Sequence, residues 1–166
     1  MNMTARPIDP AADRDYVLEC HCKINYACDS PWARELPYEQ YRANWFAMPM
    51  QQAGFWQHLT SSMEDPRGIA EIMMDDDGTI AGYLWAPFSE DAEAGFAWMD
   101  VQDIYIEEPF RGQGLASQLM ARAEEKARAC GAKVIRSGTG CENGASMAMH
   151  KKLGYYTYRY EYEKLL

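Results

Sequence analysis

A glycine-containing turn between a strand and a helix is the segment of this chain best suited to chemistry. Ile104-Tyr105-Ile106 reads as the end of a strand, and Arg111-Gly112-Gln113-Gly114-Leu115-Ala116 follows at the start of a helix. The free amide groups and the positive dipole end of a helix N-terminus bind anions. Glycine lets the backbone approach the anion closely, and Arg111 adds a positive charge that suits a pyrophosphate. The segment therefore predicts a phosphate site.

Two familiar phosphate-binding loops do not fit this segment. The dinucleotide-binding loop needs G-x-G-x-x-G at the start of a β-α-β unit, and the P-loop needs G-x-x-x-x-G-K-[ST]. Neither spacing is present in the chain. Taken alone, Gly112 and Gly114 could also do no more than shape a turn.

A second segment downstream narrows the interpretation. Asn143-Gly144-Ala145-Ser146 opens a predicted helix that ends in His150-Lys151-Lys152-Leu153-Gly154-Tyr155. With the first segment, it resembles the GNAT N-acetyltransferase superfamily. The signature R/Q-x-x-G-x-G/A of that superfamily is matched by Arg111, Gly114 and Ala116, and its second segment reads N-x-x-[AS] leading to Y-x-K-x-G-[FY]. The resemblance covers roughly residues 69–160.

The resemblance implies a role for each matched segment. The backbone amides of Arg111 to Ala116 would hold the pyrophosphate of CoA, and the edge of the strand at Ile104 to Ile106 would pair with its pantetheine arm. Asn143 would form a hydrogen bond near the pantetheine, and Ser146 joins the cofactor-binding residues. Acetyl-CoA is thus the expected co-substrate, with no metal.

The chain departs from the superfamily pattern at His150. Most members carry a Tyr there, which is thought to protonate the leaving thiolate. An imidazole can donate a proton near neutral pH, so His150 is the expected general acid. A histidine that only caps or fills the helix packing is the alternative.

The reaction also needs a neutral amine. A primary amine has a pKa of about 10.4, so neutralising it at pH 7 costs roughly 4.6 kcal/mol, and a nearby carboxylate could remove the proton. Counting back by twos from Ile106 keeps to one face of the strand and reaches Asp100. Asp103 falls on the opposite face unless the strand bulges, as is common in this superfamily. Both aspartates stay candidates for the base, and either could instead bind a cationic substrate or face solvent.

Aromatic residues mark the segments that would form the acceptor cleft. Such rings can hold a cation, and the net charge of −9 agrees with a cationic acceptor. They could equally belong to the core or to the surface of a homodimer. The residues are Trp32, Tyr38, Tyr41, Trp45, Phe55, Trp56, Tyr155, Tyr156, Tyr158 and Tyr160.

The elements that would position these residues form one α+β domain, residues 1–166. Strands are expected at 3–8, 68–74, 79–86, 96–106, 133–137 and 155–162. Helices are expected from the Asp9-Pro10 N-cap to Cys28, from Pro37, beyond Pro49, from Leu115 and over Ala145–Leu153. The resemblance adds a mixed, mostly antiparallel central sheet flanked by helices, splayed between its fourth and fifth strands.

Composition excludes several classes of protein. The acidic charge argues against nucleic-acid binding, and the chain has no run of 18 apolar residues and no secretory pattern, so we expect a cytoplasmic protein without membrane contact. An odd count of five cysteines suits reduced thiols. Cys20 and Cys22 would point apart on a helix, so Cys20-His21-Cys22 does not predict a metal site.

The sequence thus predicts an N-acetyltransferase that moves an acetyl group from acetyl-CoA to a primary amine by direct attack in a ternary complex. A small cationic amine is the expected acceptor. The alternative is a non-catalytic acyl-CoA-binding regulatory module that keeps the phosphate turn without turnover. The sequence does not distinguish acceptors or acyl chain lengths.

Overall fold

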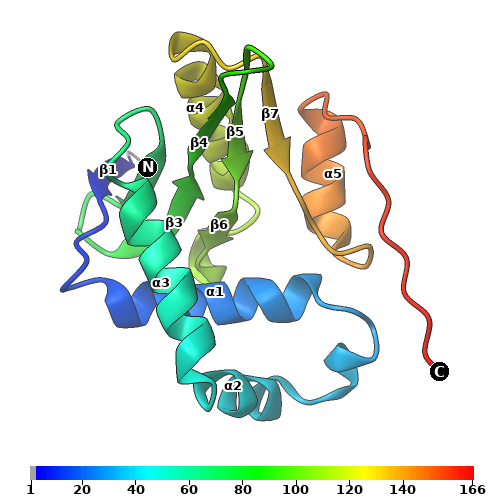
Figure 1. Ribbon diagram of the computed structural model, residues 1–166. Helices are drawn as coiled ribbons and strands as arrows, with labels where there is room; N and C mark the ends of the chain where they lie inside the picture. The colour runs from blue at the N-terminus through cyan, green and yellow to red at the C-terminus, as the bar shows by residue number, and fades with distance from the viewer. Residues whose placement is uncertain (1–2) are drawn as a thin grey trace.

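The structure is a computed structural model that describes residues 3–166 (Figure 1). The helices are α1 Arg14–Cys28, α2 Tyr38–Phe46, α3 Pro49–Ser62, α4 Leu115–Ala129 and α5 Gly144–Lys152, with 3-10 turns η1 Ala33–Glu35 and η2 Glu108–Phe110. The strands are β1 Thr4–Pro7, β2 Ile69–Met74, β3 Ile80–Ala86, β4 Phe88–Asp91, β5 Phe96–Val101, β6 Asp103–Ile106 and β7 Val134–Ser137.

The strands form two sheets, and the segment 96–106 contributes β5 to one and β6 to the other. One sheet has the order β1-β2-β3-β6 with antiparallel neighbours, and the other has the order β4-β5-β7. Among the strand pairs of residues 3–166, β5 and β7 alone run parallel, as α4 between them requires. The expected α+β class, with a mostly antiparallel sheet flanked by helices, is confirmed.

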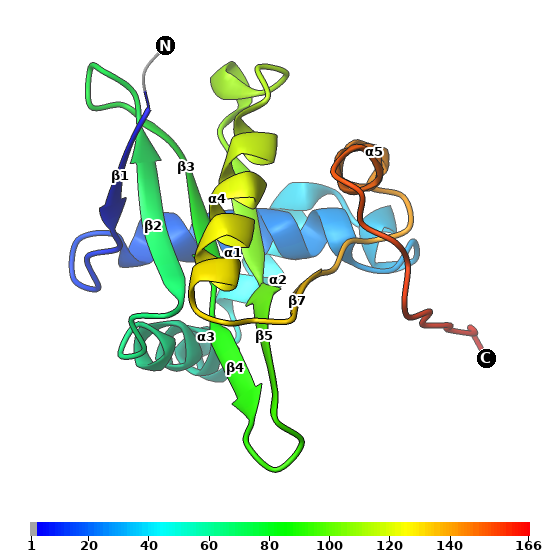
Figure 2. The ribbon, with the colours of Figure 1, turned by 90° about the horizontal axis from the view of Figure 1, so that it is seen from above.

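Alternation along the strands divides the core between two layers of helices. Tyr83 packs on one face with Val17 of α1 and Leu59 of α3. Its neighbour Leu84 packs on the other face with Leu119 of α4. Figures 1 and 2 show α3 and α4 on opposite sides of the strands.

The strand predicted at 96–106 is interrupted by a β-bulge. Asp103 is the register partner of Trp85, and the N–H of Gln102 also donates to the carbonyl of Trp85. Two residues therefore oppose one, which shifts the alternation of side chains by one position. The chain leaves one sheet and enters the other at this bulge.

The predicted strand at 155–162 is wrong. The chain has no regular structure beyond α5 and runs along its outer side (Figure 1). Tyr156, Tyr158, Tyr160 and Tyr162 are all exposed. The alternating pattern therefore has no buried face and no partner strand to hold it.

The predicted start of the first helix is also wrong. Asp9 accepts hydrogen bonds from the N–H groups of Ala11 and Ala12, which closes a turn rather than a helix. The helix begins at Arg14 with Asp13 as its N-cap. Among residues 3–166, no helix is both long enough and apolar enough to cross a membrane.

Candidate active site

The N-terminus of α4 is open to solvent and carries no side-chain cap. Gly114 is the N-cap with φ 81°, and Gly112 has φ 74°, a backbone region that favours glycine. For the N–H groups of Gly112 through Ser117, the described residues provide no acceptor. A Cβ added at Gly112 or Gly114 would meet no atom within 4 Å, so a ligand could approach both. This end of α4 can take an anion with several oxygens.

Arg111 lies at this turn but is folded back onto β6. Its Nε donates to the carbonyl oxygen of Ile106 at 2.9 Å, and its guanidinium lies 5.5 Å from the centre of the Tyr105 ring. The predicted phosphate contact of Arg111 would therefore require it to release Ile106.

The edge of β6 opposite β3 is unpaired among the described residues. β7 pairs with β5 from Trp98 to Val101 and does not continue along β6. The N–H of Glu107 donates to Ala81, so antiparallel alternation turns the N–H groups of Ile104 and Ile106 toward the unpaired edge. An extended polar chain could add to this edge beside the α4 N-terminus.

Asp103 lies at the bulge as a buried acid with two side-chain partners. It is 3% exposed, Nδ1 of His21 lies 2.7 Å from its Oδ2, and the hydroxyl of Tyr83 donates to the same oxygen. Burial and the charge of Asp103 raise the pKa of Tyr83 well above its usual value, so this hydroxyl stays a donor.

His21 stood out in the sequence only within Cys20-His21-Cys22, and the structure places its imidazole against Asp103. His21 comes from α1, and its ring contacts one ring from each of α2 and α3. Trp45 stands edge-on to it at 5.9 Å, and Phe55 stacks on it at 3.7 Å, both measured between ring centres. Helical spacing places His21 one turn from Val17, which the core buries. That spacing was the available signal for an inward-facing imidazole.

Asp100 lies on the opposite face of the strand from Ile104, so the count by twos from Ile106 is wrong. Its neighbours Met99 and Val101 share the α4 core with Ile104, because the bulge shifts the alternation. The indole N–H of Trp98 donates to Asp100 at 2.5 Å. Asp100 is partly exposed and lies outside the Asp103–His21 contact.

The second predicted segment forms α5. Asn143 caps the helix, because its Oδ1 accepts the N–H of Ser146 at 3.2 Å. Nδ1 of His150 lies 2.8 Å from the carbonyl of Ser146, and Nε2 is buried without a partner among the described residues. The ring stands edge-on to Tyr155 at 5.3 Å. His150 thus keeps one ring nitrogen uncommitted.

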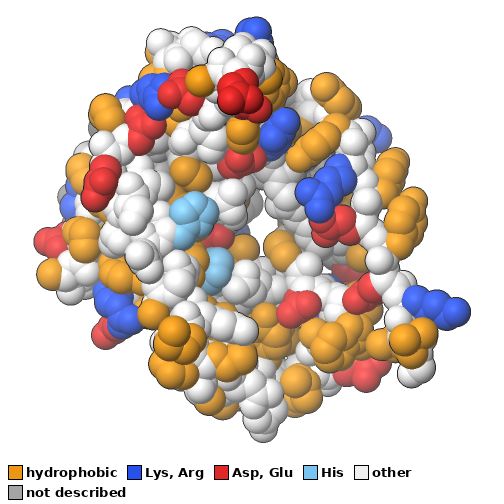
Figure 3. All heavy atoms as spheres, viewed as in Figure 1, with side chains coloured by type: hydrophobic (Ala, Val, Ile, Leu, Met, Phe, Trp, Pro, Cys, Tyr) orange, Lys and Arg blue, Asp and Glu red, His pale blue; other side chains and the backbone are white. Residues whose placement is uncertain are grey.

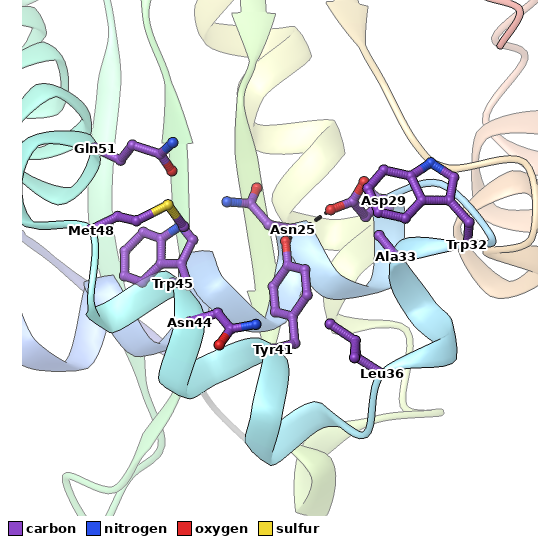
Figure 4. A pocket seen from close by; sticks show the side chains of 11 residues that line it. Asn25, Asp29, Trp32, Ala33, Leu36, Tyr41, Asn44, Trp45, Met48 and Gln51 are labelled. Atoms are coloured by element: carbon purple, nitrogen blue, oxygen red, sulfur yellow. Dashed lines mark hydrogen bonds between the residues drawn. The ribbon is translucent and has the colours of Figure 1, made fainter. Parts of the chain in front are cut away.

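A pocket of about 570 Å³ opens between α1, η1, α2 and the start of α3 (Figure 4). Predicted aromatic residues Trp32, Tyr41 and Trp45 line it, and the hydroxyl of Tyr41 donates to Asp29 at 3.0 Å. Its polar lining is completed by Asn25, Asn44 and Gln51. Figure 3, in the view of Figure 1, also shows a hollow at the centre of this face, above α1, with histidine side chains on one wall.

The other predicted aromatic residues do not line this pocket. Tyr38 and Phe55 pack against the core around Trp45, and Trp56 lies under Arg14. The C-terminal tyrosines are not among its lining residues.

No thiol in the interior is prepared for nucleophilic attack. Cys20 and Cys22 are buried, and burial raises the pKa of Cys20 to about 12. Across residues 3–166, no three His, Cys, Asp or Glu side chains gather in a way that could hold a metal ion.

Comparison with known proteins agrees with this architecture. Residues 31–155 match the model of the acetyltransferase (GNAT) family. Over 92 residues the chain is 28% identical to the L-methionine sulfoximine/L-methionine sulfone acetyltransferase of Salmonella typhimurium, and 28% identical to the L-amino acid N-acyltransferase MnaT of Escherichia coli K12. Each match covers 53% of this chain and 51% of the relative, so the chain aligns with about half the length of these relatives.

A solved structure shows the same fold over the whole chain. It is an aminoglycoside acetyltransferase, HMB0005, from an uncultured soil metagenomic sample, with a TM-score of 0.62 and 18% identity. The match covers 100% of this chain and 99% of that one.

Proposed function

Because the chain belongs to the acetyltransferase (GNAT) family, we propose that it transfers an acetyl group from acetyl-CoA to a primary amine. The observation that carries the proposal is the open N-terminus of α4. Its unpaired N–H groups, Gly112 through Ser117, lie directly after the strand whose edge is unpaired. A phosphate site and a site for an extended amide chain therefore adjoin each other, as CoA requires.

The residues at this site fit the two ends of CoA. The Gly112–Ser117 amides would bind the pyrophosphate, joined by Arg111 once it leaves Ile106. The N–H groups of Ile104 and Ile106 would bind the pantetheine amides, and Asn143 keeps its Nδ2 for the same arm while Oδ1 caps α5. The predicted splay, between the strands at 96–106 and 133–137, would admit the acyl group.

The pocket between α1, α2 and α3 suits a small cationic acceptor. Asp29 supplies a negative charge, and Trp32 and Trp45 supply aromatic faces for an ammonium group. Burial and the nearby Asp29 raise the pKa of Tyr41, which keeps its hydroxyl protonated beside that carboxylate. Amino acids belong among the amines to test, because the names of both relatives specify amino-acid acceptors.

Direct attack needs no covalent intermediate on the protein. The amine nitrogen forms a bond to the thioester carbonyl carbon, the C–S bond breaks, and the thiolate takes up a proton. His150 can supply that proton from Nε2 only as the imidazolium, because the Ser146 carbonyl holds the proton on Nδ1. Cys141 is exposed and has no role in this scheme. Cys141→Ala should therefore keep turnover within about twofold of the unmodified protein.

The test is a thiol-release assay with acetyl-CoA against polyamines, aminoglycosides, amino acids and peptides, run alongside calorimetry with CoA. Thiol release with at least one small amine supports the proposal. CoA binding without release for any amine would instead favour a non-catalytic acyl-CoA-binding module. Absence of CoA binding would contradict both.

A further inference from the structure

The contact between His21 and Asp103 joins elements that are distant in sequence and fixes the orientation of an imidazole. His21 Nδ1 lies 2.7 Å from Asp103 Oδ2, and the Tyr83 hydroxyl holds the same carboxylate from β3. The side chain of His21 is 17% exposed and that of Asp103 is 4% exposed. The Asp103 carboxylate is therefore shielded from solvent, while the His21 imidazole is partly exposed to it.

The carboxylate decides which ring nitrogen of His21 is basic. An ionised carboxylate only accepts hydrogen bonds, so Nδ1 carries the proton and Nε2 carries the lone pair in the neutral ring. Among the described residues, none forms a hydrogen bond with Nε2. His21 is thus oriented as a proton acceptor.

The position of His21 places this acceptor between two parts of the proposed site. Trp45 lines the pocket proposed for the amine, and its ring contacts that of His21. Asp103 is the first residue of β6, and the next residue, Ile104, turns its N–H to the unpaired edge. His21 does not itself line the pocket, but it lies between Trp45, which does, and Asp103, which precedes the strand edge proposed for the acyl group.

We infer that His21 is the general base of the transfer and that Asp103 is its positioning residue. This inference rests on the proposed acetyltransferase function. His21 Nε2 takes a proton from the ammonium group, directly or through water, and the neutral nitrogen then attacks the thioester carbon. When the C–S bond breaks, the nitrogen loses its second proton and the thiolate gains one. The net products are an amide, CoA thiol and one proton, which His21 returns to solvent.

The surroundings of His21 leave Asp103 as its one ionic partner among the described residues. Tyr83 from β3 is the ionisable group that hydrogen-bonds this pair, and Cys20 and Tyr16 of α1 lie near Tyr83. From α2 and α3 the neighbours are the rings of Trp45 and Phe55. On α1 itself, Glu19 pairs with Arg42, and Lys23 lies over the Tyr105 ring.

Kinetics of His21→Gln and Asp103→Asn test the assignment. With an amine that the thiol-release assay identifies, each variant should lower kcat at pH 7 by about 100-fold or more. CoA affinity should stay within about threefold. The acidic limb of the pH dependence of kcat should disappear in His21→Gln. A full rate, or an unchanged pH profile, would overturn the inference.

His58→Gln is the matched control. His58 is exposed on α3 and contacts Trp85 edge-on at 5.0 Å, with no carboxylate partner among the described residues. It should keep wild-type kcat and pH dependence. An equal loss in this variant would show a general effect of removing a histidine near the sheet, and would overturn the specific role of His21.

A spectroscopic readout keeps the inference testable without turnover. Long-range ¹H–¹⁵N NMR of the unmodified protein at pH 8 reports the tautomer of each of its three histidines, and the His21→Gln spectrum assigns the His21 signal. Protonation at Nδ1 supports the inference, and protonation at Nε2 overturns it. If no amine releases thiol, the proposed function fails, and this spectrum still decides the state of the His21–Asp103 pair.

Discussion

α4 and α5 each begin after a loop, but their N-terminal N–H groups differ in whether a side chain caps them. α5 begins after Asn143, whose side chain accepts the N–H of Ser146, the third residue of the helix. α4 begins after Gly114, and the N–H of Ser117 at the same position has no acceptor among the described residues. A capping side chain typically contributes about 1 kcal/mol. The chain thus forgoes a stabilising cap at the helix end where an external anion can bind.

The largest expected effect comes from blocking the open N-terminus of α4. Gly114→Trp should weaken CoA binding by about 100-fold or more, because the indole fills the approach to several N–H groups that each contribute about 1.5 kcal/mol or more to a charged acceptor. Calorimetry with CoA measures this.

Gly131→Trp is the matched control at the other end of the same helix. Gly131 has φ 81°, like Gly114, and a Cβ there would also meet no atom within 4 Å. Both variants therefore carry similar backbone strain. Equal CoA affinities in the two variants would contradict the assignment of the phosphate site to the α4 N-terminus.

A second test extends the comparison to α1, whose N-cap residue Asp13 is an acid held by groups that precede the helix. Asp13 accepts two hydrogen bonds from Arg6, at 2.6 and 2.7 Å, and one from the N–H of Asp9. Asp13→Asn should lower the free energy of unfolding at pH 7 by about 2 kcal/mol, because Arg6 loses a buried carboxylate partner. Urea unfolding measures this loss.

The pH dependence of that loss has a definite sign. The hydrogen bond from Arg6 lowers the pKa of Asp13, so its contribution is complete above the unfolded pKa of about 4 and is lost as pH falls through the lower folded pKa. The difference between wild type and Asp13→Asn should therefore shrink from pH 5 toward pH 2. A difference that grows toward acid would contradict the assignment.

A third change tests whether the electrostatic potential at the N-terminus of α4 favours an anion. Ser117→Glu places an anion in the first turn, which should keep or slightly raise thermal stability. The same charge should weaken CoA binding by about tenfold through repulsion of the phosphates. Ser117→Gln has the same size without the charge and should bind CoA nearly normally. Tighter CoA binding by Ser117→Glu would argue against an anion at this helix end.

The smallest effects separate two roles of Asn143. Asn143→Ala should lower the free energy of unfolding by about 1 kcal/mol, because the N–H of Ser146 loses its acceptor. Asn143→Asp keeps the cap and removes the Nδ2 donor, so it should keep stability and weaken CoA binding severalfold. Denaturant unfolding and calorimetry of both variants measure the two effects. Equal stability of the Ala and Asp variants would contradict the capping role.

The sequence predicted the features that depend on local chemistry. Gly112 and Gly114 indicated a turn with positive φ before a helix, and the structure has both. Gly131 indicated the end of that helix, which stops at Ala129. These positions follow from the conformational freedom of glycine, which acts within a few residues.

The features that the sequence did not reveal depend on pairing between distant segments. The bulge at Gln102 reflects how Trp85 of β3 pairs with both Gln102 and Asp103, and it places Asp100 on the opposite face from the one predicted. The partnership of His21 with Asp103 joins α1 to β6, which no local pattern encodes. The tyrosines after Gly154 alternate like a strand, but strand formation needs a partner edge.

The most direct test of the central claim is an amide NMR titration of the ¹⁵N-labelled protein with CoA. The account predicts that the largest shift changes fall on the N–H groups of Gly112 through Ser117, with smaller changes at Ile104 and Ile106. The first turn of α1, which follows the acidic N-cap residue Asp13, should change little. Changes centred elsewhere, with Gly112 through Ser117 unaffected at saturating CoA, would contradict the claim that the uncapped N-terminus of α4 is the CoA site.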